Sequence, residues 1–347
     1  MRRFGRTLVT AAVAVAVVAG TAGWASADSQ RAVTGPPPGA DAWRADSVSG
    51  RRLPDPASAP PREVAAFFAG LDESGRRRLL LRHPLVVGNL DGAPLPLRYE
   101  ANRLAVLATG EARFESLAGP GRRILAFDPR DRGQVAEVFG DPERAAHVSV
   151  IVPGSDNDAT TYDARRTPHT GPAGMARALR SATAGDTAVV AWTGYTTPVG
   201  VGLDAADGRL AEVGAVRLAR FTAGLDAVGA PDPVLFCHSY GSVVCGLAAR
   251  HTDASDVVVF GSPGMRAGTA AGLGTAARVW AARGPSDWIA DVPNVEVAGI
   301  GHGADPTSPA FGARRIPAGD VRGHTGYFAT GTRSLAAFAS IADGVAR

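Results

Sequence analysis

The chain has 347 residues, of which 36 are basic and 33 acidic, and its formal net charge is +3. All 36 basic residues are arginine, and three of them lie in the first 27 residues, which contain no acid, so the rest of the chain is formally neutral. This balance excludes the basic surface typical of proteins that bind nucleic acid or anionic membranes. Beyond residue 27 about 320 residues remain, enough for one large domain with its own core and an N-terminal appendage.

The N-terminus has the pattern of a secretory signal peptide over residues 1–27. Arg2, Arg3 and Arg6 precede an apolar stretch, Leu8–Ala19, and Ala25-Ser26-Ala27 provides a cleavage site. The apolar stretch is too short to span a bilayer comfortably. We therefore expect a chain secreted to the medium or to the envelope surface, cleaved near Ala27, with no stable membrane insertion afterwards.

Residues 28–60 are rich in Pro, Ser and Asp, which predicts a flexible leader. Order is expected to begin near Pro61, with an N-terminal helical segment at 61–120. Apolar residues at helical spacing start at Val64, and two further helices are predicted at Ser74–Arg82 and Arg98–Ala108.

From residue 121 to 347 apolar strands alternate with helices, which predicts an α/β domain with a mostly parallel, eight-stranded sheet covered by helices on both faces. The predicted strands are Arg123–Phe127, Gln134–Phe139, His147–Val152, Thr187–Trp192, Pro233–Cys237, Asp256–Phe260, Ala277–Ala282 and Asn294–Ala298. The predicted helices are Gly174–Ser181, Leu210–Val228, Ser242–Arg250 and Ser334–Val345. The first two strands are expected to form a hairpin at one edge.

Cys237-His238-Ser239-Tyr240-Gly241 lies between a predicted strand and a predicted helix. A serine at the apex of such a turn is how α/β-hydrolases present a nucleophilic hydroxyl, usually in the pattern G-x-S-x-G. Gly241 occupies the second small position, whereas Cys237 replaces the first glycine. Ser239 is therefore the candidate nucleophile.

A serine hydrolase of this type needs an acid and then a histidine after the serine. Asp287 follows the strand Ala277–Ala282 and is the candidate acid, although an aspartate that only caps a short helix is the alternative. Asp305 is the second candidate. His324, ahead of the last helix, is the candidate base, and His302 is its runner-up, with a loop histidine bonded to backbone as the simpler interpretation. The spacing of these residues matches no metal motif, so we expect no metal.

Backbone N–H groups are expected to stabilise the oxyanion. Tyr240, directly after the nucleophile, supplies one. The loop after His147–Val152 contains Gly154, so Ser155 or Asp156 is expected to supply the other. The alternative is an ordinary Pro-Gly turn.

Two cysteines, Cys237 and Cys245, flank Ser239 and are the only cysteines of the chain. In an exported protein such a pair forms a disulfide if the backbones approach closely enough across the turn. Two buried thiols are the simpler interpretation and the one we favour from the sequence.

The chain resembles a family of secreted or membrane-linked actinobacterial α/β-hydrolases known as a domain of unknown function, over residues 61–345. The segments that carry the resemblance are His83-Pro84, Gly88–Pro94, Arg98, Ala101-Asn102-Arg103, Val152-Pro153-Gly154, His238–Ser242, Gly261-Ser262-Pro263-Gly264, Gly323-His324 and Tyr327-Phe328. The resemblance implies Ser239 as nucleophile, Asp287 as acid and His324 as base, with the oxyanion loop near Gly154. It implies no particular substrate.

Together these patterns predict a secreted serine hydrolase that needs no cofactor and acts on a small-molecule or acyl ester. The loops Tyr195–Arg209 and Gly301–Arg322 are expected to shape a modest pocket for short or medium acyl chains. An acyltransferase, or an amidase or peptidase, would use the same triad. A binding protein of the envelope that has lost catalysis is the alternative of a different class.

Overall fold

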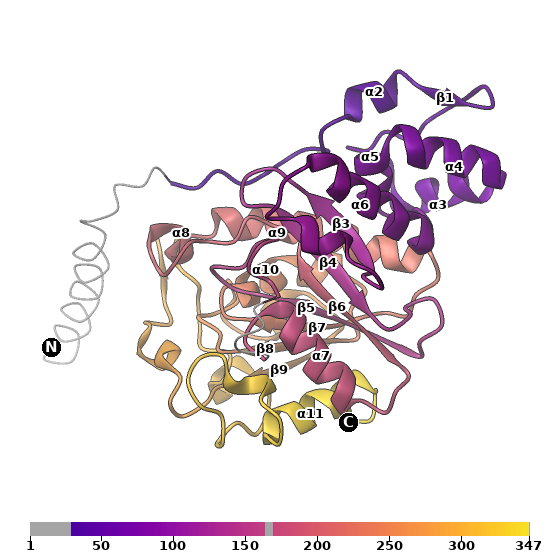
Figure 1. The fold of residues 1–347 in the computed structure, drawn as a ribbon. Helices are drawn as coiled ribbons and strands as arrows, with labels where there is room; N and C mark the ends of the chain where they lie inside the picture. The colour runs from indigo at the N-terminus through magenta and orange to yellow at the C-terminus, as the bar shows by residue number, and fades with distance from the viewer. Residues whose placement is uncertain (1–28, 164–168, 347) are drawn as a thin grey trace, which may run out of the picture.

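An eight-stranded sheet forms the centre of the computed structural model, which describes residues 29–163 and 169–346 (Figure 1). The strand order is β12-β9-β8-β7-β5-β6-β4-β3. β3 and β4 are antiparallel to each other and β4 is antiparallel to β6, whereas the other neighbours are parallel. The strands are β3 (Ile124–Asp128), β4 (Gln134–Phe139), β5 (His147–Val152), β6 (Thr187–Thr193), β7 (Val234–His238), β8 (Asp256–Phe260), β9 (Arg278–Ala282) and β12 (Arg314–Arg315).

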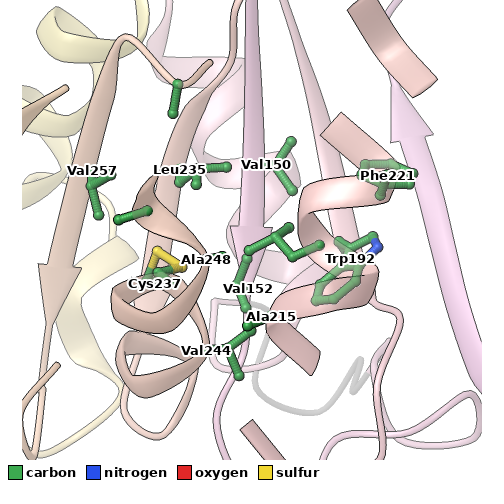
Figure 2. Packing of buried hydrophobic residues seen from close by; sticks show 14 of the residues in the cluster. Val150, Val152, Trp192, Ala215, Phe221, Leu235, Cys237, Val244, Ala248 and Val257 are labelled. Carbon is green, nitrogen blue, oxygen red and sulfur yellow. A yellow bond between two sulfur atoms is a disulfide. The ribbon is translucent and has the colours of Figure 1, made fainter. Parts of the chain in front are cut away.

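Helices cover both faces of this sheet. On one face, α9 (Arg209–Ala227) and α10 (Gly241–Ala248) pack on one set of strand residues, as Figure 2 shows. On the other face, α7 (Pro172–Ala182) and α11 (Arg333–Ala342) pack on the alternate residues. In β7, for example, Leu235 and Cys237 belong to the first cluster and Phe236 to the second. Burial on both faces is why the central strands are continuous apolar runs in the sequence.

The N-terminal part forms a folded layer of its own at the β3 end of the sheet (Figure 1). It contains α2 (Ala40–Arg44), a small hairpin of β1 (Ser47–Val48) and β2 (Arg51–Arg52), α3 (Pro61–Ala69), α4 (Glu73–Arg82), α5 (Pro84–Gly88), α6 (Leu95–Thr109) and the 3-10 turn η2 (Glu115–Ala118). The helices predicted at Ser74–Arg82 and Arg98–Ala108 are thus present, the second with an earlier start.

The prediction of a flexible leader at 28–60 is wrong for the residues from Ser29 onward. Trp43 is fully buried in the apolar cluster of this layer, and its indole N–H donates to the carbonyl of Pro54 at 2.7 Å. Gln30 and Val33 hydrogen-bond to the loop that follows β6. Prolines mark turns between packed segments here, a pattern that composition alone does not separate from a tether. The predicted signal peptide, residues 1–27, lies outside the described residues.

The eighth predicted strand, Asn294–Ala298, is not part of the main sheet. Its residues form β10 (Glu296–Val297), which pairs only with β11 (Ile300–Gly301) in an exposed hairpin. The edge position next to β9 is taken by β12, whose two arginines have no apolar pattern that could have predicted it. The other seven predicted strands and the four helices predicted for the domain overlap observed elements.

None of the helices in the part of the chain that the structure describes is long and apolar enough to cross a membrane.

Candidate active site

Ser239 lies at the apex of a sharp turn between β7 and α10. Its φ of 53° is in the left-handed region, which costs a non-glycine residue about 1–2 kcal/mol. The surrounding backbone imposes this conformation, because the Ser239 N–H donates to the carbonyl of Phe260 at 3.1 Å. Gly241 is required on the helix side, since a Cβ there would lie 2.3 Å from the carbonyl oxygen of Val152. Such local strain is typical of a functional turn.

A disulfide joins Cys237, at the end of β7, to Cys245, in the second turn of α10 (Figure 2). The two Cα atoms are 6.4 Å apart, within the range that a disulfide spans. Of the two possibilities for this pair, the structure therefore has the bridge and not the free thiols. The cysteine that replaces the usual glycine links the strand and the helix on either side of Ser239.

Asp287 and His324 form a buried hydrogen-bonded pair. The His324 Nδ1 lies 2.8 Å from the Asp287 Oδ1, and the side chain of Asp287 is fully buried. Burial raises the pKa of this carboxyl, but hydrogen bonds from His324, Tyr327 and the Ile289 N–H outweigh burial and leave its pKa below the ordinary value. The ionised Asp287 therefore accepts a hydrogen bond from the Nδ1–H of His324, and Nε2 is left with its lone pair.

The capping role considered for Asp287 is also present. Its Oδ1 accepts from the Ile289 N–H at 3.0 Å at the start of the short 3-10 helix η5 (Trp288–Asp291). The two interpretations of the sequence are thus not exclusive, because the capping bond helps to orient the carboxylate toward His324.

His238 is a residue of the site that sequence reasoning missed. Its ring is buried, and its Nε2–H donates to the backbone carbonyl of His324 at 2.7 Å. Burial, and the proximity of His324, lower the pKa of His238 to about 3, so the ring is neutral at physiological pH. The position lies inside the elbow pattern, where any residue is allowed, and no spacing in the sequence indicates this contact.

Tyr327 and Gly261 complete the surroundings of Asp287. The Tyr327 hydroxyl donates to the Asp287 Oδ2 at 2.5 Å and accepts from the Gly284 N–H at 3.0 Å. Gly261 has a φ of 56°, and a Cβ there would lie 3.0 Å from the Asp287 Oδ2 and 3.1 Å from the His324 Cε1. Both residues lie in the segments that carry the family resemblance. That resemblance is the one feature of the sequence that could have indicated a role for them.

The relative placement of Ser239 and His324 follows from these neighbours. Ser239 is adjacent to His238, whose ring centroid is 4.6 Å from that of His324, and it is bonded to Phe260, which precedes Gly261. In the part of the chain that the structure describes, the Ser239 hydroxyl and His324 form no direct hydrogen bond. Such bonds are often long in the absence of substrate.

The loop after β5 approaches the nucleophile as predicted. A Cβ on Gly154 would lie 2.6 Å from the Ser239 Cβ and 3.0 Å from the Tyr240 backbone nitrogen. The prediction of Asp156 as an oxyanion donor is wrong, because the Asp156 N–H donates to the carbonyl of Pro198 at 2.8 Å. Ser155 and Tyr240 remain the candidate donors.

The loop after β6 holds this oxyanion loop in place. The Tyr195 hydroxyl donates to the carbonyl of Pro153 at 2.7 Å, and the Gly200 N–H donates to the Asp156 carboxylate at 2.8 Å. Gln30 in turn bonds to Thr197 and Val199 of the same loop. The Tyr195–Arg209 segment, which contains α8 (Leu203–Ala206), therefore fixes the position of the oxyanion loop through hydrogen bonds.

The runner-up residues are engaged elsewhere. The His302 Nε2 donates to the carbonyl of Ala205 at 2.7 Å, which is the simpler interpretation given for it, and burial lowers its pKa. Asp305 forms an ion pair with Arg283 at 2.7 Å and caps the turn at Thr307. Within the described ranges, no group of three or more His, Cys, Asp or Glu side chains is placed to hold a metal ion.

The sheet order, the strained serine turn and the buried Asp–His pair define the α/β-hydrolase fold, as the sequence predicted. A protein-family model described as "Alpha/beta hydrolase" matches residues 128–297. The match covers just under half of the chain and agrees with the α/β-hydrolase fold of the structure.

Relatives and solved structures were also found. Two uncharacterised proteins of Mycobacterium tuberculosis, from strains CDC 1551 and H37Rv, are 27% identical over 382 residues, which cover 84% of this chain and 57% of each relative. The chain thus spans little more than half the length of these curated relatives. Among solved structures, a serine hydrolase without a lid from Xanthomonas campestris is 17% identical with a TM-score of 0.39, over 65% of this chain and 94% of its own. A putative esterase from Staphylococcus aureus is 8% identical with a TM-score of 0.40, over 73% of this chain and 92% of its own.

Proposed function

We propose that the protein is a serine hydrolase that cleaves carboxylic esters through an acyl-enzyme on Ser239. The observation that carries this proposal is the buried pair of Asp287 and His324 beside a serine held at a left-handed turn. The pKa of Asp287 is lowered, so its carboxylate is ionised and accepts a hydrogen bond from the Nδ1–H of His324. The Nε2 of His324 is then available as a general base.

The reaction follows the chemistry of this geometry. His324 Nε2 takes the proton of the Ser239 hydroxyl as the oxygen attacks the acyl carbon, and the negative charge develops on the former carbonyl oxygen. The Tyr240 and Ser155 N–H groups stabilise that charge. His324 then gives the proton to the leaving alcohol, and the C–O bond to that alcohol breaks. A water molecule that gives its proton to His324 attacks the acyl-enzyme, the bond between the acyl carbon and the Ser239 Oγ breaks, and His324 returns the proton to Ser239 as the carboxylic acid leaves. Asp287 stays ionised throughout and balances the imidazolium.

We propose that the protein works outside the cytoplasm. The signal-peptide pattern over residues 1–27 is the sequence argument. The disulfide between Cys237 and Cys245 is an independent argument, because structural disulfides persist mainly in oxidising compartments.

Labelling of the purified chain without residues 1–27 by a fluorophosphonate probe tests the proposed chemistry. We expect the wild type to be labelled, Ser239→Ala to lose labelling completely, and His324→Ala to be labelled at least about 10³-fold more slowly, because the residual reactivity of a triad without its base is small. His302→Ala is the control and should be labelled like wild type. A folded wild type that is not labelled would contradict the proposal and favour the binding protein.

A further inference from the structure

Trp288 differs from the other tryptophans of the described structure. Trp43, Trp192 and Trp280 are at most 8% exposed, whereas Trp288 is 43% exposed. It directly follows Asp287 and begins η5. An indole that remains in water next to a buried carboxylate is an unusual placement for a large apolar side chain.

The indole of Trp288 contacts the candidate base. Its ring centroid is 4.6 Å from that of His324, with the ring planes inclined by 41°. The side chain of His324 is itself only 14% exposed. Trp288 thus covers part of the imidazole with one portion of its ring system and presents the rest to solvent.

The proposed reaction locates the leaving group next to this surface. His324 must come within hydrogen-bond distance of the alcohol oxygen to give it the proton. The substituent on that oxygen then lies close to the exposed indole of Trp288, which contacts His324.

We propose that Trp288 is the specificity-determining residue for the alcohol side of the substrate, and that the preferred substrates are esters of aromatic or similarly flat, apolar alcohols. This inference rests on the proposed function. A flat ring gains both buried apolar area and stacked or edge-to-face contact with the indole, whereas a methyl group gains neither.

The test compares benzyl butyrate with methyl butyrate, which share the acyl group and release alcohols of similar acidity. We expect the wild type to favour the benzyl ester in kcat/KM, and Trp288→Ala to lower kcat/KM for it by about tenfold, mainly through KM. Methyl butyrate loses no contact with Trp288, so the ratio of the two kcat/KM values should fall by about tenfold even where exposure of His324 lowers both values. Trp288→Phe should retain most of the preference. Val297→Ala, a change of a more exposed apolar side chain in β10, should leave both rates unchanged.

A second measurement is independent of turnover. In Ser239→Ala, benzyl alcohol should protect Trp288 from quenching of its fluorescence by acrylamide, and the additional change Trp288→Phe should remove this protected signal. If the wild type reacts with fluorophosphonate but Trp288→Ala keeps the full benzyl preference, the inference is wrong and the proposed function stands. If fluorophosphonate does not react, the proposed function is wrong and the inference is wrong with it. If fluorophosphonate reacts but benzyl alcohol does not protect Trp288, only the inference is wrong.

Discussion

The loops that carry His302 and His324 have similar sequences, each with a glycine directly before the histidine, but the two rings do different work. The His302 ring anchors its own loop, with Nε2 bonded to the carbonyl of Ala205. In the other loop this anchoring bond comes from His238, whose Nε2 is bonded to the carbonyl of His324 itself.

The comparison shows how a histidine becomes available for chemistry. Because His238 holds the backbone of the His324 loop, the His324 ring needs no structural bond at Nε2, and its hydrogen bond is the one from Nδ1 to Asp287. Asp305, the carboxylate that follows His302 in the sequence, is instead paired with Arg283. His324 differs from His302 because a second histidine, His238, makes the structural bond to its loop. The loop sequences themselves do not show this difference.

The largest expected effect is on the labelling rate, when Asp287 beside His324 and Asp305 near His302 are each replaced by asparagine. Asp287→Asn should lower the rate of fluorophosphonate labelling by about 10⁴-fold, because an amide stabilises the wrong tautomer of His324 and no imidazolium. Asp305→Asn should change the rate less than about threefold. Equal effects of the two variants in a stopped-time labelling assay would break the distinction between the loops.

An intermediate effect is expected on stability at acid pH. The pKa of His238 in the fold is about 3, below that of the unfolded chain at about 6.5, so the unfolded state binds an extra proton between these values. Stability is therefore complete above pH 6.5 and falls on acidification, by about 1.4 kcal/mol per pH unit from this residue. His302, whose pKa is also lowered, adds to the slope.

Urea unfolding of wild type and His238→Gln at pH 7 and pH 5 measures this contribution. Glutamine keeps a donor but does not titrate, so the loss of stability between the two pH values should be about 2 kcal/mol smaller in the variant. The matched variant His302→Gln should also flatten the slope but leave labelling unaffected. An unchanged slope in His238→Gln would mean that this ring is not held neutral in the fold.

The smallest effect is expected from Tyr327→Phe. Loss of the hydroxyl removes one of the three donors to Asp287 and leaves the Gly284 N–H without its acceptor. We expect about a tenfold slower labelling and a loss of about 1–3 kcal/mol in the free energy of unfolding. A labelling rate like that of Asp287→Asn would show instead that Tyr327 is as important as the carboxylate itself.

Part of the candidate site could be predicted from the chain alone. The alternation of buried strands and helices indicated the sheet, and the order of elements pointed to Ser239, Asp287 and His324 because reactive groups gather beyond the carboxyl ends of parallel strands. These are local patterns of apolar periodicity and position after a strand, which survive in a linear sequence.

The tertiary structure decided the rest. Which histidine is free, whether Ser155 or Asp156 has an available N–H, and whether Cys237 meets Cys245 all depend on partners distant in the sequence, such as His238 for His324 and Pro198 for Asp156. The folded state of residues 29–60 and the edge strand β12 were missed for the same reason. Their order comes from burial and backbone pairing against other segments, and neither leaves a periodic pattern in the residues themselves.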